Sequence, residues 1–181
     1  MGFCLVGMAA LTQAGMNGAM LQMFNHGTIT AMLFLLVGVL YDRAHTREID
    51  RFGGIASVMP RYAALFGFAF MASLGLPGLS GFVGELLVFL GAFPAHRVVT
   101  VVAMTGVIIT AAYHLWALQR VQLGRWNEAW RDRSAFRDLT ARETLTLVPL
   151  AAIVLVLGLW PMPMLQLAST GLGDLLRHVK P

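Results

Sequence analysis

Long stretches of this chain carry no formal charge, and this feature limits the folds that it can adopt. Residues 1–40, 98–119 and 144–173 contain no Asp, Glu, Lys or Arg. A transmembrane helix needs about 20 mostly apolar residues, so each run is long enough to hold one. Only 12% of the residues are charged, against about 25% in soluble domains. The sequence therefore predicts an integral membrane protein and excludes a soluble enzyme, a nucleic-acid module and a disordered segment.

The apolar runs predict an all-α, polytopic transmembrane helix bundle with about five helical segments in one domain, 1–181. A weak turn signal over Gln13–Gly18 separates the first two segments, and the run Pro161-Met162-Pro163 closes the last. The expected helices are 1–14, 18–41, 62–93, 98–120 and 144–165. The first of them would cover about 21 Å, less than the roughly 30 Å of a bilayer core. We therefore expect the chain to be the C-terminal part of a longer protein.

Basic residues concentrate in two of the expected loops. The loops 42–61 and 120–143 contain four and six arginines, and the opposite side has only Arg97, Arg177 and Lys180. Loops rich in Lys and Arg face the cytoplasm in most membrane proteins. The pattern predicts that both loops are cytoplasmic and that the C-terminus is periplasmic, in the inner membrane of a bacterium.

The segment 62–93 contains a signal for a break in its helix. Fully helical, it would be about 48 Å long, which is more than one crossing needs. Pro77 removes a backbone donor and clashes with the preceding turn, and Gly75 and Gly78 weaken the helix further. We therefore expect a discontinuous helix, interrupted near Gly75–Ser80.

Three ionisable side chains within the apolar segments are candidates for chemistry, because a charge at the bilayer centre costs at least about 2.5–3.5 kcal/mol. Glu85 follows the helix break by one or two turns, and broken helices recur at transporter ion sites. His26 could relay protons, since imidazole titrates near neutral pH. The alternatives are a structural Glu85 neutralised by hydrogen bonds and a hydrogen-bonded structural His26. For His114, near the end of its segment, an interfacial aromatic belt is a sufficient explanation.

Motifs for cofactors are missing from the sequence. It has one cysteine, Cys4, and contains no dinucleotide fingerprint, no zinc spacing and no ligand set for haem or an iron–sulfur cluster. We expect no metal site, no bound cofactor and no catalytic redox site in this chain.

Further runs in the chain are Met1-Gly2-Phe3, Gln22-Met23-Phe24-Asn25-His26-Gly27 and the loop that begins at Tyr41. They resemble the M-subunit family of bacterial respiratory complex I, whose mitochondrial counterpart is subunit 4 of NADH dehydrogenase. The resemblance covers essentially the whole chain and is strongest in 1–95. The run Tyr41-Asp42-Arg43-Ala44-His45-Thr46-Arg47 is the most discriminating feature. The motif from Leu74-Gly75-Leu76-Pro77-Gly78 to Glu85 recurs across the antiporter-like superfamily, which includes Mrp-type cation/proton antiporters.

The resemblance implies a proton-translocating membrane subunit, driven by NADH oxidation and quinone reduction elsewhere in the complex. On the family pattern, Glu85 matches the terminal protonatable carboxylate and His26 a relay histidine of the preceding helix, whereas His114 and His45 match no relay role. NADH, FMN, iron–sulfur clusters and quinone would be bound by other subunits. The implied partners are other membrane subunits, especially neighbouring antiporter-like ones, and the lipid bilayer.

Two alternatives stay open. The chain could belong to an Mrp-type cation/proton antiporter or a membrane-bound hydrogenase, or it could be a purely structural membrane subunit without an ion path. The loop at 41–47 favours the complex I family over the antiporters and hydrogenases. Proton flux after substitution of Glu85 separates a structural subunit from the others.

Overall fold

Helices make up the regular structure of the computed structural model, which describes residues 1–127, 130 and 136–179. No strand occurs in these ranges, so the all-α prediction is confirmed. Two short 3-10 helices, η1 (Ile49–Arg51) and η2 (Ile55–Ser57), lie between α2 and α3. In chain order the α-helices are α1 (Gly2–Ala9), α2 (Gln13–Ala44), α3 (Pro60–Ser73), α4 (Ser80–Ala92), α5 (Arg97–Gln122), α6 (Ala141–Leu159) and α7 (Met162–Val179).

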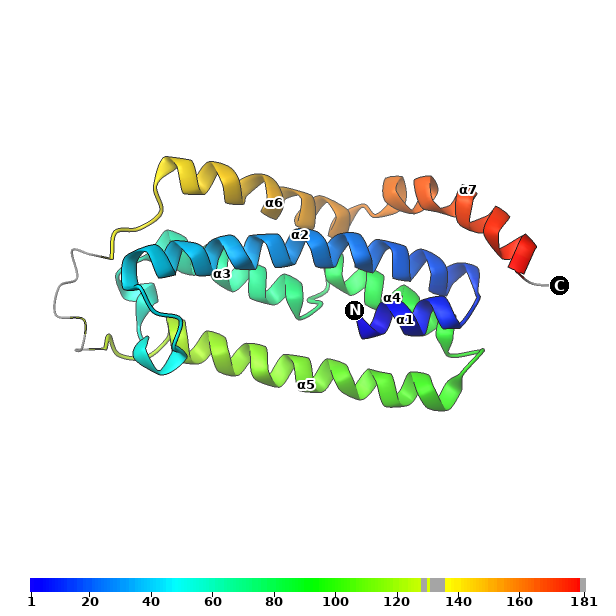
Figure 1. Ribbon diagram of the computed structural model, residues 1–181, viewed down its shortest axis with the longest axis horizontal. Helices are drawn as coiled ribbons and strands as arrows, with labels where there is room; N and C mark the ends of the chain where they lie inside the picture. The colour runs from blue at the N-terminus through cyan, green and yellow to red at the C-terminus, as the bar shows by residue number, and fades with distance from the viewer. Residues whose placement is uncertain (128–129, 131–135, 180–181) are drawn as a thin grey trace.

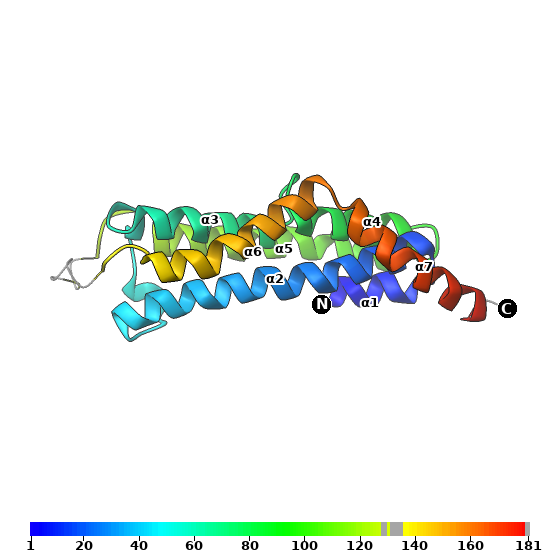
Figure 2. The same cartoon turned by 90° about the horizontal axis from the view of Figure 1, so that it is seen from above.

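The long helix α2 is the central element of an elongated bundle. It packs against α1, α3, α4, α6 and α7. Figure 1 shows α5 and α6 on opposite sides of α2, and in both Figure 1 and Figure 2 α3 and α4 follow each other end to end along the bundle. The connections from α2 to α3 and from α5 to α6 leave the bundle at the same end (Figure 1). Arg131, Arg133 and Lys180, which contributed to the loop comparison, lie outside the described residues.

Within the part of the chain that the structure describes, three helices are long and apolar enough to cross a membrane by length and composition: α2, α5 and α6. The helices α3 and α4 have 14 and 13 residues, so each covers only about 20 Å. Because they lie end to end, together they match the length of one crossing. The expected interruption is confirmed, since α3 ends at Ser73 and α4 begins at Ser80.

The first turn lies earlier than the sequence predicted. The expected helices 1–14 and 18–41 placed the turn within Gln13–Gly18, but α1 ends at Ala9 and α2 already begins at Gln13. The cause is Thr12, whose side chain accepts a hydrogen bond from the Gly15 N–H at 3.1 Å and caps the new helix. The Thr12 hydroxyl also donates to the Gly91 carbonyl, which ties this turn to α4.

The prediction for the last segment was wrong at its far end. We expected one helix over 144–165, closed by the prolines, but α6 ends at Leu159 and a further helix, α7, runs from Met162. Proline has no N–H to donate. The first turn of a helix tolerates this, because backbone N–H groups in that turn have no intrahelical acceptor. Pro161 and Pro163 therefore end one helix and also begin the next.

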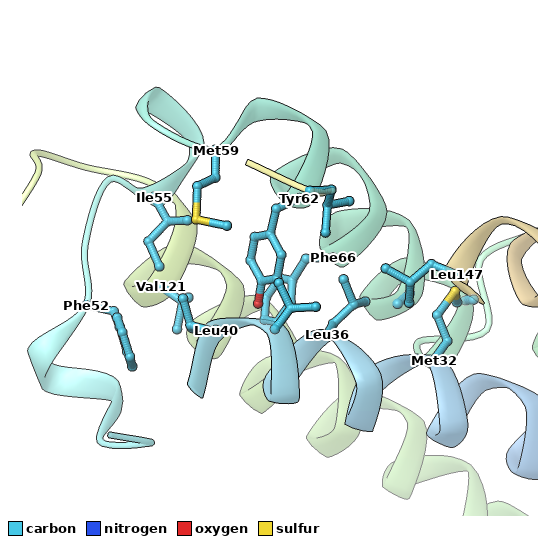
Figure 3. Close-up of a cluster of buried hydrophobic side chains, with 14 of the residues drawn as sticks. Met32, Leu36, Leu40, Phe52, Ile55, Met59, Tyr62, Phe66, Val121 and Leu147 are labelled. Carbon is cyan, nitrogen blue, oxygen red and sulfur yellow. The ribbon is translucent and has the colours of Figure 1, made fainter. Parts of the chain in front are cut away.

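A cluster of buried apolar side chains fills the end of the bundle that carries the two connections. Tyr62 and Met59, both fully buried, lie at its centre, and the ring of Tyr62 stacks on Phe66 at 5.5 Å between centroids. Figure 3 shows these side chains facing Leu36 and Leu40 of α2. The core thus fixes α3 against α2.

Arg43 joins three segments at this end. Its guanidinium forms a two-pronged ion pair with Glu143 of α6, with N–O distances of 2.9 and 3.0 Å. The two side chains are only 9% and 20% exposed. Glu143 also forms a capping box with Thr140 at the start of α6. Arg43 further donates to three backbone carbonyls, those of Val39, Arg137 and Asp138.

Asp138 caps the start of α3 from a distant part of the chain. Its carboxylate accepts the N–H groups of Arg61 and Tyr62 at 2.9 and 3.0 Å and that of Leu139 at 2.8 Å. Burial raises the pKa of Asp138, but these three donors and the charge of Arg61 lower it more, so the net pKa is below the usual value.

The helices α2 and α4 touch through their backbones. A Cβ added to Gly18 would lie 2.6 Å from the Val88 nitrogen, and one added to Gly91 would overlap the Gly15 backbone. Small residues allow this close approach between membrane helices. Since no side chain larger than hydrogen fits at these positions, the spacing and register of α2 and α4 are fixed.

Candidate functional site

The break between α3 and α4 has a local cause in the sequence. The N–H of Gly75 bonds to the Ala72 carbonyl and that of Leu76 to the Met71 carbonyl, which is the Schellman pattern of a helix end. Gly75 has a φ of +73°, the left-handed conformation that this pattern requires. Pro77, two residues later, cannot continue the helix. This arrangement ends α3 within the apolar part of the chain.

The carboxyl group of Glu85 lies directly against this break. A Cβ added to Gly75 would stand 2.8 Å from Oε2 of Glu85 and 3.3 Å from its Cδ. The carboxyl group therefore occupies the space that a side chain at position 75 would need. The two halves of the interrupted helix meet at this point: Gly75 closes the first half, and Glu85 projects from the second.

Glu85 faces a polar cavity of about 210 Å³ enclosed by α1 to α5. The two other ionisable side chains singled out in the sequence, His26 of α2 and His114 of α5, line the same cavity. The hydroxyl and amide side chains around it are those of Gln22, Thr30, Ser73, Thr110 and Tyr113. The structure therefore brings together titratable groups from three helices that are far apart in the sequence. We call this space the polar cavity.

The Glu85 carboxyl group is partly buried and forms no hydrogen bond or ion pair with any described residue. The alternative of a structural carboxyl neutralised by protein hydrogen bonds thus finds no support in these ranges. On its other side Glu85 borders an apolar cavity of about 480 Å³ between α4 and α5, lined by Phe82, Leu86 and Val101 among others. The carboxyl group therefore lies at the boundary between polar and apolar space.

Asn25 and His26 are neighbours on α2 with different surroundings. Asn25 is buried, and its Nδ2 donates to the Ser80 carbonyl at 2.7 Å, which holds the first turn of α4 against α2. His26 lines the polar cavity but is largely exposed in this chain, and it bonds to no described residue. The ring of His26 therefore borders the cavity, while its neighbour anchors the second half-helix.

His114 is more buried than a residue of an interfacial aromatic belt would be. It is the most buried of the three titratable residues, at 8% exposure, and its ring meets the edge of Phe70 at 5.3 Å. Its Nδ1 lies 2.9 Å from the Thr110 carbonyl, one turn earlier. This contact uses a backbone carbonyl, which any residue at position 110 would supply, so the sequence carries no signal for it. The position near the end of its segment instead suggested an interfacial role.

The polar cavity is lined by side chains that can take part in proton transfer. The described residues contain no group of three or more His, Cys, Asp or Glu side chains placed to hold a metal ion. The cavity combines a carboxyl group, two imidazoles and several hydroxyl groups, all of which can exchange protons through hydrogen bonds.

Comparison with known proteins gives a consistent family signal. Residues 1–110 match the family described as NADH:quinone oxidoreductase/Mrp antiporter, TM. The chain is 43% identical to NADH-quinone oxidoreductase subunit M of Rhodobacter capsulatus over 98% of its length, covering 34% of that protein. It is 38% identical to NADH-ubiquinone oxidoreductase chain 4 of Marchantia polymorpha, covering 36% of that protein. The chain thus spans about a third of the length of the curated relatives that it matches.

A solved structure supports the same grouping. The structure described as respiratory complex I from Thermus thermophilus with bound NADH contains a chain that matches 97% of this one, with a TM-score of 0.82 and 34% identity. The match covers 37% of that chain. The residues matched to the family, 1–110, include His26 and Glu85 and stop short of His114.

Proposed function

Because this chain belongs to the transmembrane family of NADH:quinone oxidoreductases and Mrp antiporters, we propose that it carries protons within the membrane part of an NADH:quinone oxidoreductase. It is a multi-pass membrane protein, with apolar helices of spanning length. The similarity to proteins named subunit M and chain 4 favours the oxidoreductase over an antiporter. The run Tyr41–Arg47 favours the same assignment.

The observation that carries the proposal is the placement of the Glu85 carboxyl group. It lies at a helix break, borders the polar cavity and has no described hydrogen-bonding partner. In the proposed reaction the carboxylate takes a proton from water in the cavity and becomes neutral, which removes the cost of a charge in the membrane. It then returns the proton to water or to His26. Because His26 lines the same cavity, it is the second group of this relay.

The sidedness and the partners belong to the same proposal. The loops 42–61 and 120–143 would face the cytoplasm and the C-terminus the periplasm of a bacterial inner membrane. The chain would pack against other membrane subunits, including antiporter-like neighbours. NADH, FMN, iron–sulfur clusters and quinone would be held by other subunits, which supply the redox chemistry. This chain would contribute proton transfer alone.

The test is proton pumping by the assembled complex in membrane vesicles, measured together with quinone reduction. Glu85→Gln keeps the shape of the side chain but cannot titrate, so we expect intact assembly and a strong loss of pumping. Glu85→Asp should retain part of the activity, and His26→Ala should be milder because water can bridge a missing relay group. The matched control is Glu48→Gln, because Glu48 is exposed and pairs with Arg51 outside the cavity.

Each alternative has its own outcome in this experiment. Normal pumping by an assembled Glu85→Gln complex would identify Glu85 as structural and favour a subunit without an ion path. Proton transport driven by a sodium gradient, without quinone reduction, would favour an Mrp-type cation/proton antiporter, which the matched family also includes. Hydrogen-driven pumping would favour a membrane-bound hydrogenase.

A further inference from the structure

His114 is a buried titratable residue that the proposed relay of Glu85 and His26 does not use. It lines the polar cavity with both of them, from the third helix, α5. The other titratable side chain of α5 in the cavity wall is Tyr113, which is exposed. A buried imidazole in a polar cavity needs a reason, because an aromatic belt would place it at the membrane surface with its polar edge in water.

The hydrogen bond to Thr110 fixes the tautomer of His114. A carbonyl oxygen can only accept, so Nδ1 of His114 carries the hydrogen in the 2.9 Å contact. In the neutral ring Nε2 is then the free acceptor. The edge contact with Phe70 helps to hold the ring plane. The imidazole is therefore oriented, with one nitrogen committed to the backbone and the other available for a proton.

The position of His114 along the bundle differs from that of Glu85. Glu85 lies seven residues, about 10 Å, before the end of α4 at Ala92. His114 lies eight residues, about 12 Å, before the end of α5 at Gln122. These helix ends are at opposite ends of the bundle (Figure 1). His114 thus extends the set of titratable groups toward the end that carries the two connections.

We propose that His114 is a third proton carrier of the polar cavity, which exchanges protons at Nε2 with Glu85 and His26 and links them to the end of the bundle where α2 joins α3. This inference rests on the proposed function of Glu85. Protonated Glu85 releases its proton to cavity water, and Nε2 of His114 binds a proton from that water to give an imidazolium ion. The ring later releases the same proton from Nε2, while the Nδ1 hydrogen stays on the Thr110 carbonyl.

The test uses variants of the assembled complex in membrane vesicles. His114→Asn places an amide N–H near the position of Nδ1, so it can keep the bond to Thr110 while removing the titratable nitrogen. We expect normal assembly and a fall in pumping of about tenfold, less than the 10²-fold of a positioned acid or base, because ordered water carries part of the transfer. His96→Asn is the control, since His96 precedes α5 and lies outside the cavity wall.

A second variant separates proton transfer from shape. In His114→Ala, added imidazole should restore pumping, whereas pyrazole, a ring of the same size and a far weaker base, should not. Equal rescue by both rings, or normal pumping by assembled His114→Asn, overturns the inference. If Glu85→Gln abolishes pumping while His114→Asn is normal, only the role of His114 fails. If Glu85→Gln pumps normally, the proposed function itself fails.

Discussion

Substitution of Gly75 by alanine tests whether the helix break positions Glu85. Gly75 has a φ of +73°, and the left-handed conformation costs a residue with a Cβ roughly 1–2 kcal/mol. The new Cβ would also stand 2.8 Å from Oε2 of Glu85. Because Oε2 is the far end of a flexible side chain, it can move away at little energetic cost. A normal contact near 3.5 Å requires a shift of about 0.7 Å.

The two effects can be separated with Gly78→Ala. Gly78 also has a positive φ, +93°, but no atom lies within 4 Å of an added Cβ. Both variants should therefore lose similar stability, about 1–2 kcal/mol, and only Gly75→Ala should displace the Glu85 carboxyl group. Since a misplacement of about 1 Å can cost 10²-fold in rate, we expect Gly75→Ala to reduce pumping at least tenfold more than Gly78→Ala.

The assay compares thermal unfolding midpoints and proton pumping for both variants in the assembled complex. Equal midpoints with unequal pumping would support a positioning role for the glycine. If both variants pump equally well, contact between the carboxyl group and the break has no part in the activity.

Two further predictions concern the end of the bundle with the connections. Arg43→Met leaves Glu143 and three carbonyls without their buried donor, so the free energy of unfolding should fall by about 3 kcal/mol or more. Arg51→Met removes an exposed ion pair and should change the free energy of unfolding little. Asp138→Asn should lower the free energy of unfolding by about 1 kcal/mol at pH 7, which is the typical effect of losing a helix cap. Because the folded pKa of Asp138 is lowered, its carboxylate stabilises the fold above the unfolded value of about 4, and this contribution is lost as the pH falls through the folded value. Unfolding curves for wild type and Asp138→Asn should therefore converge in acid, and a constant difference between them would contradict this assignment.

Features with a strong local cause could be predicted from the sequence. The interruption after Ser73 follows from a glycine and a proline that no regular helix accommodates, and the apolar runs located the spans. The turn at Ala10–Thr12 escaped prediction because its neighbours are apolar and a single hydroxyl group decides where α2 begins. Similarly, Pro161 could be recognised as the end of a helix, but its second role in starting α7 depends on the residues that follow.

The candidate site was only partly predictable for a different reason. Glu85 stands out because it is the one carboxylate in a long apolar segment, and this can be read locally. The neighbourhood of His114 cannot be inferred from the local sequence, because it depends on how α5 lies against α2 and α4. Its burial is a property of three helices together, and in the sequence alone it resembles any histidine near aromatic residues.

The backbone contact between α2 and α4 determines how two walls of the polar cavity are aligned. Sliding α4 along α2 would bring larger side chains to the positions of Gly18 and Gly91, where none fits. The backbone register that places Glu85 on the same cavity as His26 is therefore set by residues that carry no side chain. A substitution at Gly18 or Gly91 would act on the cavity without touching any of its titratable groups.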